Sequence, residues 1–250
     1  MLRGLVTALR TLTVLPIPGK EAVRFCSALH WFPVVGLLLG LIQAGAGYLS
    51  MAAGWSEFAA AVVLLAGVLL TRGIHVDGFA DVADGFFGGG NVERRLRIMK
   101  DPAVGSFGAL SLVLLFIFKW VVLVKLISLG LYDWIVSGVV LARLSQVLLA
   151  SSLPYARNEG GTASGFVDGA GPLHLVSSVS ISFIILFVLF NGIFLPFGFA
   201  LLAASVSVAF SGFLSLKKIE GVTGDVLGAS SELTEALVWG AGAVFFMSLC

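Results

Sequence analysis

Three aspartates, Asp77, Asp81 and Asp84, recur at spacings of four and three residues between His75 and Gly85. On a helix these positions fall on one face, so their carboxylates would lie close together. Like charges on one helix face repel each other, and a divalent cation would offset that repulsion. An all-oxygen ligand set suits Mg²⁺ or Mn²⁺ better than Zn²⁺. The spacing therefore predicts a metal site, and a solvated acidic turn between two membrane spans is the structural alternative.

A second polar segment, residues 220–232, contains two acids, Asp225 and Glu232, that share one helical face. Thr223, Gly224 and Asp225 can form a turn that caps the start of the last helix. A functional site and a plain helix cap both fit this segment. We favour a site because both acidic segments are expected on the same face of the membrane.

Cations follow the first acidic segment, namely Arg94, Arg95, Arg97 and Lys100. Cations beside a metal suit a phosphorylated ligand, because the metal and the Arg or Lys side chains share its oxygens. Arg94 and Arg95 fit equally well a basic loop that lies on anionic lipid headgroups. Lys100 and Asp101, next to a glycine-containing turn, are the stronger functional candidates.

Two further cations, Lys119 and Arg143, lie near the middles of apolar segments. A central Lys or Arg costs about 2.5–3.5 kcal/mol on insertion scales, so both are expected to face the interior of a helix bundle or a polar cavity. A functional role and a structural role are both open for these two residues.

The composition of the chain is that of a membrane protein. Of its 250 residues, 58% are hydrophobic and 12% are charged, whereas roughly 25% are charged in soluble domains. The formal net charge of +1 provides no broad basic surface, so nucleic acid is not an expected partner. The two cysteines lie near opposite ends of the chain and indicate neither a disulfide framework nor a metal cluster.

Seven apolar segments of 17 to 26 residues are candidate spans: 31–53, 57–73, 105–130, 133–153, 173–193, 195–216 and 234–250. The second and seventh are marginal against the roughly 20 residues that cross the hydrocarbon core, which leaves an even count open. The first 29 residues are expected to form an amphipathic or re-entrant segment in which Pro16 and Pro18 end any helix. Trp31, Trp55 and Trp134 are expected at the membrane interface.

Positive charges alternate between the connections. Lys and Arg occur in the N-terminal segment and in the connections 74–104, 154–172 and 217–233, and the short connections between these contain none. The positive-inside rule then places the N-terminus and every long polar connection on the cytoplasmic side. We therefore expect an all-α fold, a polytopic transmembrane helical bundle of about seven spans that forms a single domain over residues 1–250.

Common catalytic motifs give no alternative chemistry. The sequence has no G-x-S-x-G, P-loop, G-x-G-x-x-G or H-E-x-x-H pattern, which argues against hydrolase-triad, nucleoside-triphosphatase, Rossmann and zincin chemistry. Metal-assisted transfer of a phosphorus-bearing group at the membrane surface remains.

The chain resembles the membrane-bound cobalamin synthases, also called adenosylcobinamide-GDP ribazoletransferases, over most of its length. The segments that carry the resemblance are, in order, Leu12–Pro18, Phe32–Leu37, His75–Gly85, Glu93–Arg95, Ile98–Asp101 with Gly105 and Gly108, Tyr155–Gly160 and Thr223–Leu233. Each segment is short, and their common order makes the combination specific.

The resemblance implies a reaction between adenosylcobinamide-GDP and α-ribazole or its 5′-phosphate. A ribose hydroxyl attacks the phosphorus next to the aminopropanol arm of the corrinoid and GMP leaves, which gives adenosylcobalamin or its 5′-phosphate. Mg²⁺ is the implied cofactor, with Mn²⁺ as a substitute. The expected location is the cell membrane with the active site on the cytoplasmic side. Membrane lipid is an expected partner, and a homo-oligomer is compatible with these features.

The resemblance also implies roles for the candidate residues. Asp77, Asp81, Asp84 and Asp225 would hold the metal, and Asp77, Asp81 or His75 would accept the proton of the attacking hydroxyl. The expected substrate-binding residues, with Lys100 and Arg157 on phosphate oxygens, are Lys100, Asp101, Arg157, Thr223, Gly224, Glu232, Lys119 and Arg143.

A CDP-alcohol phosphotransferase is the alternative within the same chemistry, since such enzymes also release a nucleoside monophosphate at an acid-rich membrane helix. Their acids follow a Gly-x-x-x-Asp-x-x-x-Asp pattern after an Ala-Arg element, whereas no Arg follows Ala80 or Ala83 here. Membrane prenyltransferases need an Asn-Asp-x-x-Asp-like pattern, which is absent. A transporter would explain the many spans, but the sequence shows no internal repeat and its polar residues gather on one face.

Overall fold

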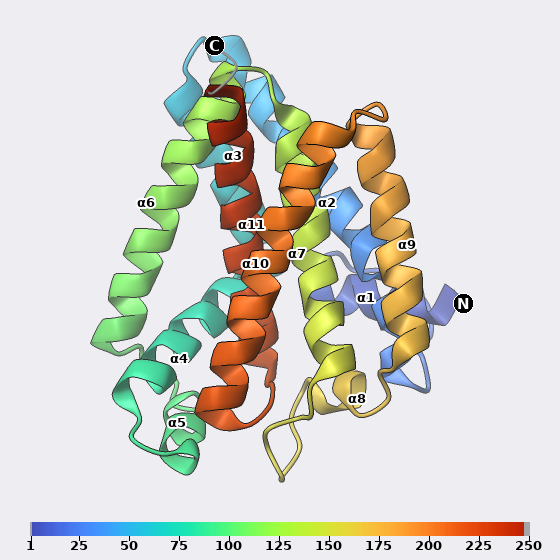
Figure 1. Cartoon of the computed structure of the whole chain (residues 1–250), viewed down its shortest axis with the longest axis vertical. Helices are drawn as coiled ribbons and strands as arrows, with labels where there is room; N and C mark the ends of the chain where they lie inside the picture. Colours follow the sequence, from blue (N-terminus) through green and yellow to red (C-terminus); the bar gives the residue numbers. More distant parts are fainter. Residues whose placement is uncertain (1, 248–250) are drawn as a thin grey trace.

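The computed structural model describes residues 2–247 as a bundle of α-helices joined by short turns (Figure 1). The helices are α1 (Leu2–Leu12), α2 (Phe32–Ser50), α3 (Ser56–Thr71), α4 (Ile74–Gly88), α5 (Val92–Ile98), α6 (Ser106–Ser128), α7 (Tyr132–Ser152), α8 (Ser164–Val167), α9 (Pro172–Leu189), α10 (Phe194–Ile219) and α11 (Gly224–Met247). Two 3₁₀ turns, η1 (Phe25–Trp31) and η2 (Met51–Ala53), flank α2. The all-α class expected from the sequence is confirmed.

Within the described residues, five helical stretches are long and apolar enough to cross a membrane: Phe25–Ala53, α6, α7, α9 and α10. Helices α3 and α4 would together form a sixth, but the chain bends by 90° between them. The bend occurs at Arg72 and Gly73, whose φ angles of 55° and 67° end α3 in the left-handed region. The expected span 234–250 is the C-terminal part of α11, and its residues 248–250 lie outside the described residues.

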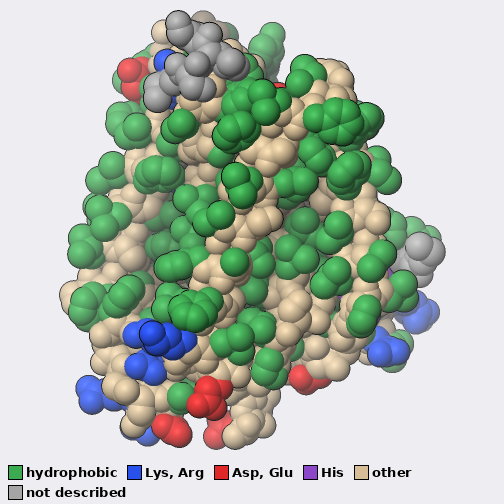
Figure 2. All heavy atoms as spheres, in the orientation of Figure 1, with side chains coloured by type: hydrophobic (Ala, Val, Ile, Leu, Met, Phe, Trp, Pro, Cys, Tyr) green, Lys and Arg blue, Asp and Glu red, His purple; other side chains and the backbone are tan. Residues whose placement is uncertain are grey.

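An apolar belt covers the face of the molecule shown in Figure 2, and charged side chains gather mainly below it. The helices that form this belt, α6, α9 and α10, expose many large apolar side chains. Water does not favour such a surface, whereas the hydrocarbon of a bilayer does. The chain is therefore a membrane protein.

Helix α7 lies in the middle of the bundle and is buried along most of its length (Figure 1). It packs against α11 through two reciprocal pairs in which a glycine leaves room for an indole ring. Gly138 of α7 faces Trp239, and Gly242 of α11 faces Trp134. The glycine opposite Trp134 accommodates its ring, and this side chain in the first turn of α7 is fully buried.

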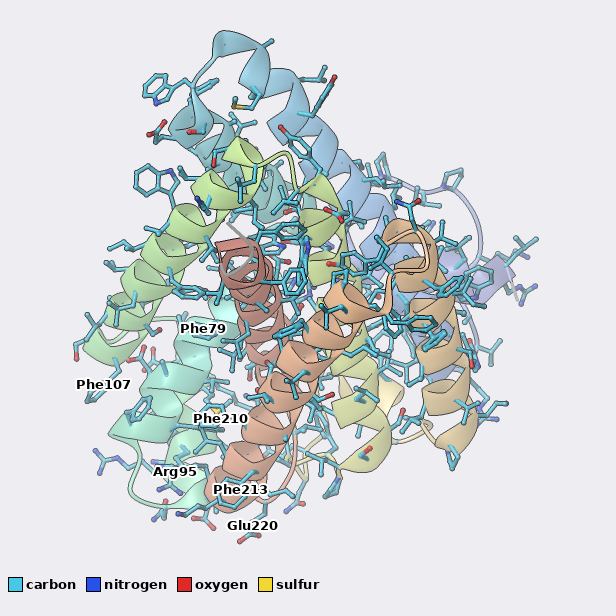
Figure 3. All side chains as sticks on the ribbon, turned by 45° about the horizontal axis from the view of Figure 1, so that its top comes forward. Phe79, Arg95, Phe107, Phe210, Phe213 and Glu220 are labelled. Atoms are coloured by element: carbon cyan, nitrogen blue, oxygen red, sulfur yellow. The ribbon has the colours of Figure 1, made fainter. Side chains whose placement is uncertain are left out.

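The charged end of the molecule is formed by α4, α5, α8 and the loop between α7 and α8 (Figure 1). Arg95 and Glu220 both lie at this end in Figure 3. The guanidinium of Arg95 donates to the carbonyl oxygen of Lys218 at 2.9 Å, and Lys218 Nζ donates to the carbonyl oxygen of Phe86 at 2.9 Å. These two bonds fix α4 and α5 to the last turn of α10.

The N-terminal segment forms α1, which ends at Leu12, and then continues without regular structure past Pro16 and Pro18. This agrees with the expectation that the two prolines exclude a helix. The guanidinium of Arg10 donates to the carbonyl oxygens of Ile17 and Gly19, at 2.9 and 3.1 Å, and so folds the segment back against α1.

Candidate active site

The two acidic segments of the sequence meet in space because glycines let α4 and α11 approach closely. A Cβ at Gly78 of α4 would lie 2.9 Å from the Cα of Asp225, and one at Gly228 of α11 would lie 3.1 Å from the Cα of His75. Any larger side chain at these positions would force the helices apart. The contact brings the face of α4 that carries Asp77 beside the first turn of α11.

The acid cluster formed by this contact consists of Asp77, Asp81 and Asp225. Asp77 is exposed, and the other two are half-buried. The carboxylate of Asp81 lies within electrostatic range of the other two carboxylates and of the guanidinium of Arg157. Oδ2 of Asp225 accepts hydrogen bonds from Arg157 Nη2 at 2.8 Å and from Thr223 Oγ1 at 3.1 Å. Negative charge therefore exceeds positive charge in the cluster, which favours a cation or a cationic ligand.

The carboxylates of the acid cluster fit Mg²⁺ by type. Within residues 2–247, no three His, Cys, Asp or Glu side chains are arranged to enclose a metal ion. Mg²⁺ does not need such a cage, because proteins usually hold it by one or two carboxylates while water and substrate phosphates complete its shell. Helix α4 and helix α11 each supply carboxylates of this kind. The donor set is therefore suited to a Mg²⁺ ion that is shared with a phosphorylated substrate.

Asp84, which the sequence analysis also expected on the metal, caps α6. Its Oδ2 accepts a hydrogen bond from the amide of Gly105 at 2.7 Å, and its Oδ1 accepts one from the amide of Gly108 at 2.8 Å. The carboxylate is buried, and a negative charge at a helix N-terminus is stabilising. Both glycines are required, because a Cβ at either one would overlap the carboxylate.

We expect Asp84→Asn to lower the thermal stability of the purified protein. Asparagine offers one side-chain acceptor to two amide donors, so one amide loses its partner. Losing a hydrogen bond to a charged group costs about 1.5–3 kcal/mol. The measurement is thermal unfolding in detergent followed by circular dichroism, with Glu93→Gln, an exposed acid on α5, as the control. An unchanged melting temperature in Asp84→Asn would contradict the capping role.

The segment before α11 has the cap that its sequence indicated. Helix α11 begins at Gly224, and the amide of Val226 donates to Thr223 Oγ1 at 3.3 Å. Thr223 thus holds the first turn of the helix and the carboxylate of Asp225 at the same time. His75, a candidate proton acceptor, lies in the first turn of α4, which begins at Ile74.

A polar basin of about 580 Å³ opens next to the acid cluster at the charged end. Helix α5, the α7–α8 loop and the end of α10 line it, with the side chains of Glu93, Arg97, Lys100, Tyr155, Arg157, Asn158, Glu159 and Glu220 among them. Arg157 connects the basin to the acid cluster because it lines the basin and binds Asp225. The wall carries three cations beside three carboxylates, and the cations can bind phosphate oxygens.

Lys100 and Asp101 occupy different surroundings. Lys100 lines the polar basin, where its Nζ forms an exposed ion pair with Glu159 at 3.1 Å. Asp101 lies outside the basin lining, and its Oδ1 accepts a hydrogen bond from the amide of Ala103 at 2.9 Å within a turn. Of the two, Lys100 is the residue placed to contact a ligand.

The α7–α8 loop is held to the chain before α11 by backbone hydrogen bonds. The amide of Ala156 donates to the carbonyl oxygen of Val222 at 2.9 Å, and the amide of Val222 donates to that of Pro154 at 2.8 Å. These bonds place Arg157 beside Asp225. Burial raises the pKa of the neighbouring Tyr155 phenol, so its hydroxyl stays protonated at neutral pH and can donate a hydrogen bond.

Lys119, Arg143 and Glu232, expected to bind substrate, form a separate buried charge network. Lys119 Nζ makes ion pairs with Glu232 and, at 2.9 Å, with Glu235, while Arg143 donates to Ser231. The cavity beside these side chains measures about 20 Å³. That volume holds one water molecule and excludes a substrate.

A family model described as cobalamin-5-phosphate synthase matches residues 4–243. The chain belongs to this family. It is 67% identical over 249 residues to an adenosylcobinamide-GDP ribazoletransferase of Chlorobium phaeobacteroides, and the match covers 100% of both chains.

More distant relatives carry the same name. The protein from Chlorobaculum tepidum is 52% identical over 249 residues, with 100% of this chain and 98% of the relative covered. The protein from Syntrophobacter fumaroxidans is 36% identical over 247 residues, with 96% and 98% covered. No solved structure gives a significant match. The resemblance to cobalamin synthases expected from the sequence is confirmed.

Two residues of interest were not predicted from the sequence. The structure places one near the acid cluster and the other in the buried charge network. Gln146 of α7 is buried and lines a cavity that Asp77 and Asp225 also line. Glu235 is the second carboxylate on Lys119. Both are polar residues in apolar stretches of sequence. Gln146 lies three residues after Arg143, and Glu235 lies three residues after Glu232; the sequence had indicated both of those earlier residues. That spacing on a helix was the available signal.

Proposed function

We propose that this protein joins adenosylcobinamide-GDP to α-ribazole or α-ribazole 5′-phosphate and releases GMP. A ribose hydroxyl oxygen forms a bond to the phosphorus next to the corrinoid arm, the diphosphate linkage breaks, and GMP leaves with the bridging oxygen. The observation that carries the proposal is the contact of α4 with α11, which places three carboxylates beside Arg157 at the edge of the polar basin. The shared name of the relatives supports the identity of the substrates.

The residues of the site divide the work between binding and proton transfer. Arg157 and Lys100 bind phosphate oxygens in the polar basin, where Arg97 adds a further positive charge. A carboxylate of the acid cluster accepts the proton of the attacking hydroxyl. Mg²⁺ held by Asp77, Asp81 and Asp225 would neutralise charge on the departing phosphate. Asp84 is left out of this ligand set because both of its oxygens bind backbone amides.

The proposed location of the reaction is the cytoplasmic face of the cell membrane. The polar basin includes cations from α5 and the α7–α8 loop, and hydrogen bonds of Arg95 and Lys218 hold α4 and α5 to α10 at the same end. An excess of Lys and Arg marks the cytoplasmic side of a membrane protein. Lipid contacts the exposed apolar side chains of α6, α9 and α10.

The test of the reaction is GMP release by protein purified in detergent or nanodiscs. We expect GMP and a cobalamin product to form together from adenosylcobinamide-GDP and α-ribazole 5′-phosphate when Mg²⁺ is present, and neither to form with EDTA. Formation of product in EDTA would overturn the metal proposal. Absence of turnover with these substrates, together with CMP release from a CDP-alcohol and an acceptor alcohol, would instead assign the site to that class of phosphotransferase.

A further inference from the structure

A second cavity, the apolar pocket, has Asp225 in its wall and measures about 350 Å³. It is lined by Thr11, Leu12, Leu29, Phe32, Ile74, His75, Asp77, Gln146, Thr162, Ala163, Phe166, Gly224, Asp225 and Leu227. Its volume is within the range of about 300–1,000 Å³ that is usual for small-molecule sites. A reaction of two substrates needs two binding regions that meet at the reacting atoms, and the two cavities meet at the Arg157–Asp225 ion pair.

The walls of the apolar pocket suit a flat, apolar ring. Leu12, Leu29, Phe32 and Phe166 are all buried, and the ring centroids of the two phenylalanines lie 5.9 Å apart. Aromatic side chains bind flat rings by stacked or edge-to-face contacts. These walls therefore provide contact area for an aromatic base.

Two residues that line the apolar pocket each have a buried polar atom with no hydrogen-bond partner within the described residues. The atoms are Oε1 of Gln146 and Nδ1 of His75, and each residue is 3% exposed. Buried polar atoms are nearly always hydrogen-bonded, so an unpaired one in a cavity indicates a ligand that completes it. Gln146 lies on α7 and His75 on α4, so the two groups come from separate helices.

We infer that the apolar pocket binds α-ribazole or its 5′-phosphate, the nucleoside acceptor of the proposed reaction, with Gln146 as the residue that recognises it. The benzimidazole ring lies against Leu12, Phe32 and Phe166, and a ribose hydroxyl of the nucleoside donates a hydrogen bond to Oε1 of Gln146. The ribose then extends toward Asp77 and Asp225, which line the same pocket. The assignment rests on the proposed function, and it leaves the polar basin to the diphosphate of the donor.

The reverse assignment, with the guanine base of the donor in the apolar pocket, would require the polar side chains of the pocket to pair with every edge of the base. Guanine presents several donors and acceptors that each need a partner when buried. A dimethylbenzimidazole ring bound to ribose presents a single ring nitrogen as acceptor. The apolar side chains that form most of this wall match the second ring.

The assignment is tested by equilibrium dialysis of α-ribazole and of α-ribazole 5′-phosphate against purified protein without the corrinoid donor. We expect Gln146→Leu to weaken binding about tenfold or more, because the apolar side chain keeps the volume and removes the hydrogen bond. Gln43→Leu is the matched control: Gln43 is 2% exposed and its Oε1 also lacks a partner, but it lines the small cavity beside Lys119. The Gln43→Leu variant should bind the nucleoside with wild-type affinity.

Phe166→Ala is the second variant, since it removes a ring from the wall and leaves α7 unchanged. It should weaken binding of the nucleoside in dialysis and raise KM for the nucleoside, with KM for adenosylcobinamide-GDP unaltered. The assignment would be overturned if both pocket variants bound the nucleoside with wild-type affinity, or if Gln43→Leu lost as much affinity as they do. It would also be overturned if the wild type bound no nucleoside, or if only KM for the donor rose. Nucleoside binding that depends on Gln146 in a protein that releases no GMP would retain the pocket and reject the proposed reaction.

Discussion

Asp81→Asn is expected to reduce GMP release by about a hundredfold or more while the protein inserts and folds normally. The substitution removes one of three carboxylates from the acid cluster, and with it a metal ligand or the group that accepts the hydroxyl proton. General acid–base catalysis alone contributes typically 10²–10⁴-fold to a rate. The readout is kcat for GMP release at saturating substrates, measured beside a thermal unfolding curve of the metal-free protein.

The unfolding curve separates catalysis from folding. Asp81 lies within electrostatic range of Asp77 and Asp225, so neutralising it relieves repulsion between like charges and should leave the melting temperature equal or higher. Asp84→Asn has the opposite signature, because its expected primary effect is on stability. Asp168→Asn, an exposed acid after α8, serves as the control with unchanged activity. Full activity of Asp81→Asn would reject the acid cluster as the reacting centre.

The acid cluster could be predicted in part because its phasing is a local property. Asp77 and Asp81 are one helical turn apart, and any α-helix places them on one face. Asp225 could be added because it starts another helix with an expected position on the same side of the membrane. The close approach of α4 and α11 at Gly78 and Gly228 brings these aspartates together. It depends on how two helices pack, which no local sequence pattern predicts.

The hydrogen-bond partners of Asp84 could not be predicted from the local sequence. It has the same helical phase as the other two aspartates, yet its oxygens bind amides that lie 21 and 24 residues further along the chain. The direction of its side chain toward α6 is decided by the packing of α4 on α6. The burial of Trp134 likewise depends on a glycine in α11. Residue type and period predict a face of a helix, and the facing helix decides the partner.

Lys119 is the residue whose removal should most destabilise the protein. Its ammonium group is 2% exposed and pairs with Glu232 and Glu235 of α11. Lys119→Met would leave two carboxylates buried side by side, with Arg143 as a nearby cation that binds Ser231. Breaking a buried ion pair by removing one partner costs about 3–5 kcal/mol. We expect a large fall in melting temperature or loss of the folded protein from detergent extracts.

A compensating variant distinguishes this structural role from the substrate binding that the sequence suggested. Glu232→Gln and Glu235→Gln, added together to Lys119→Met, remove the unpaired charges and should restore much of the stability, because the penalty comes from buried charge rather than from lost contacts. Lys125→Met, on the same helix and half-buried, should remain close to the wild type in stability. If Lys119 served substrate instead, Lys119→Met would keep the wild-type melting temperature and raise KM. The cavity of about 20 Å³ beside it favours the structural outcome.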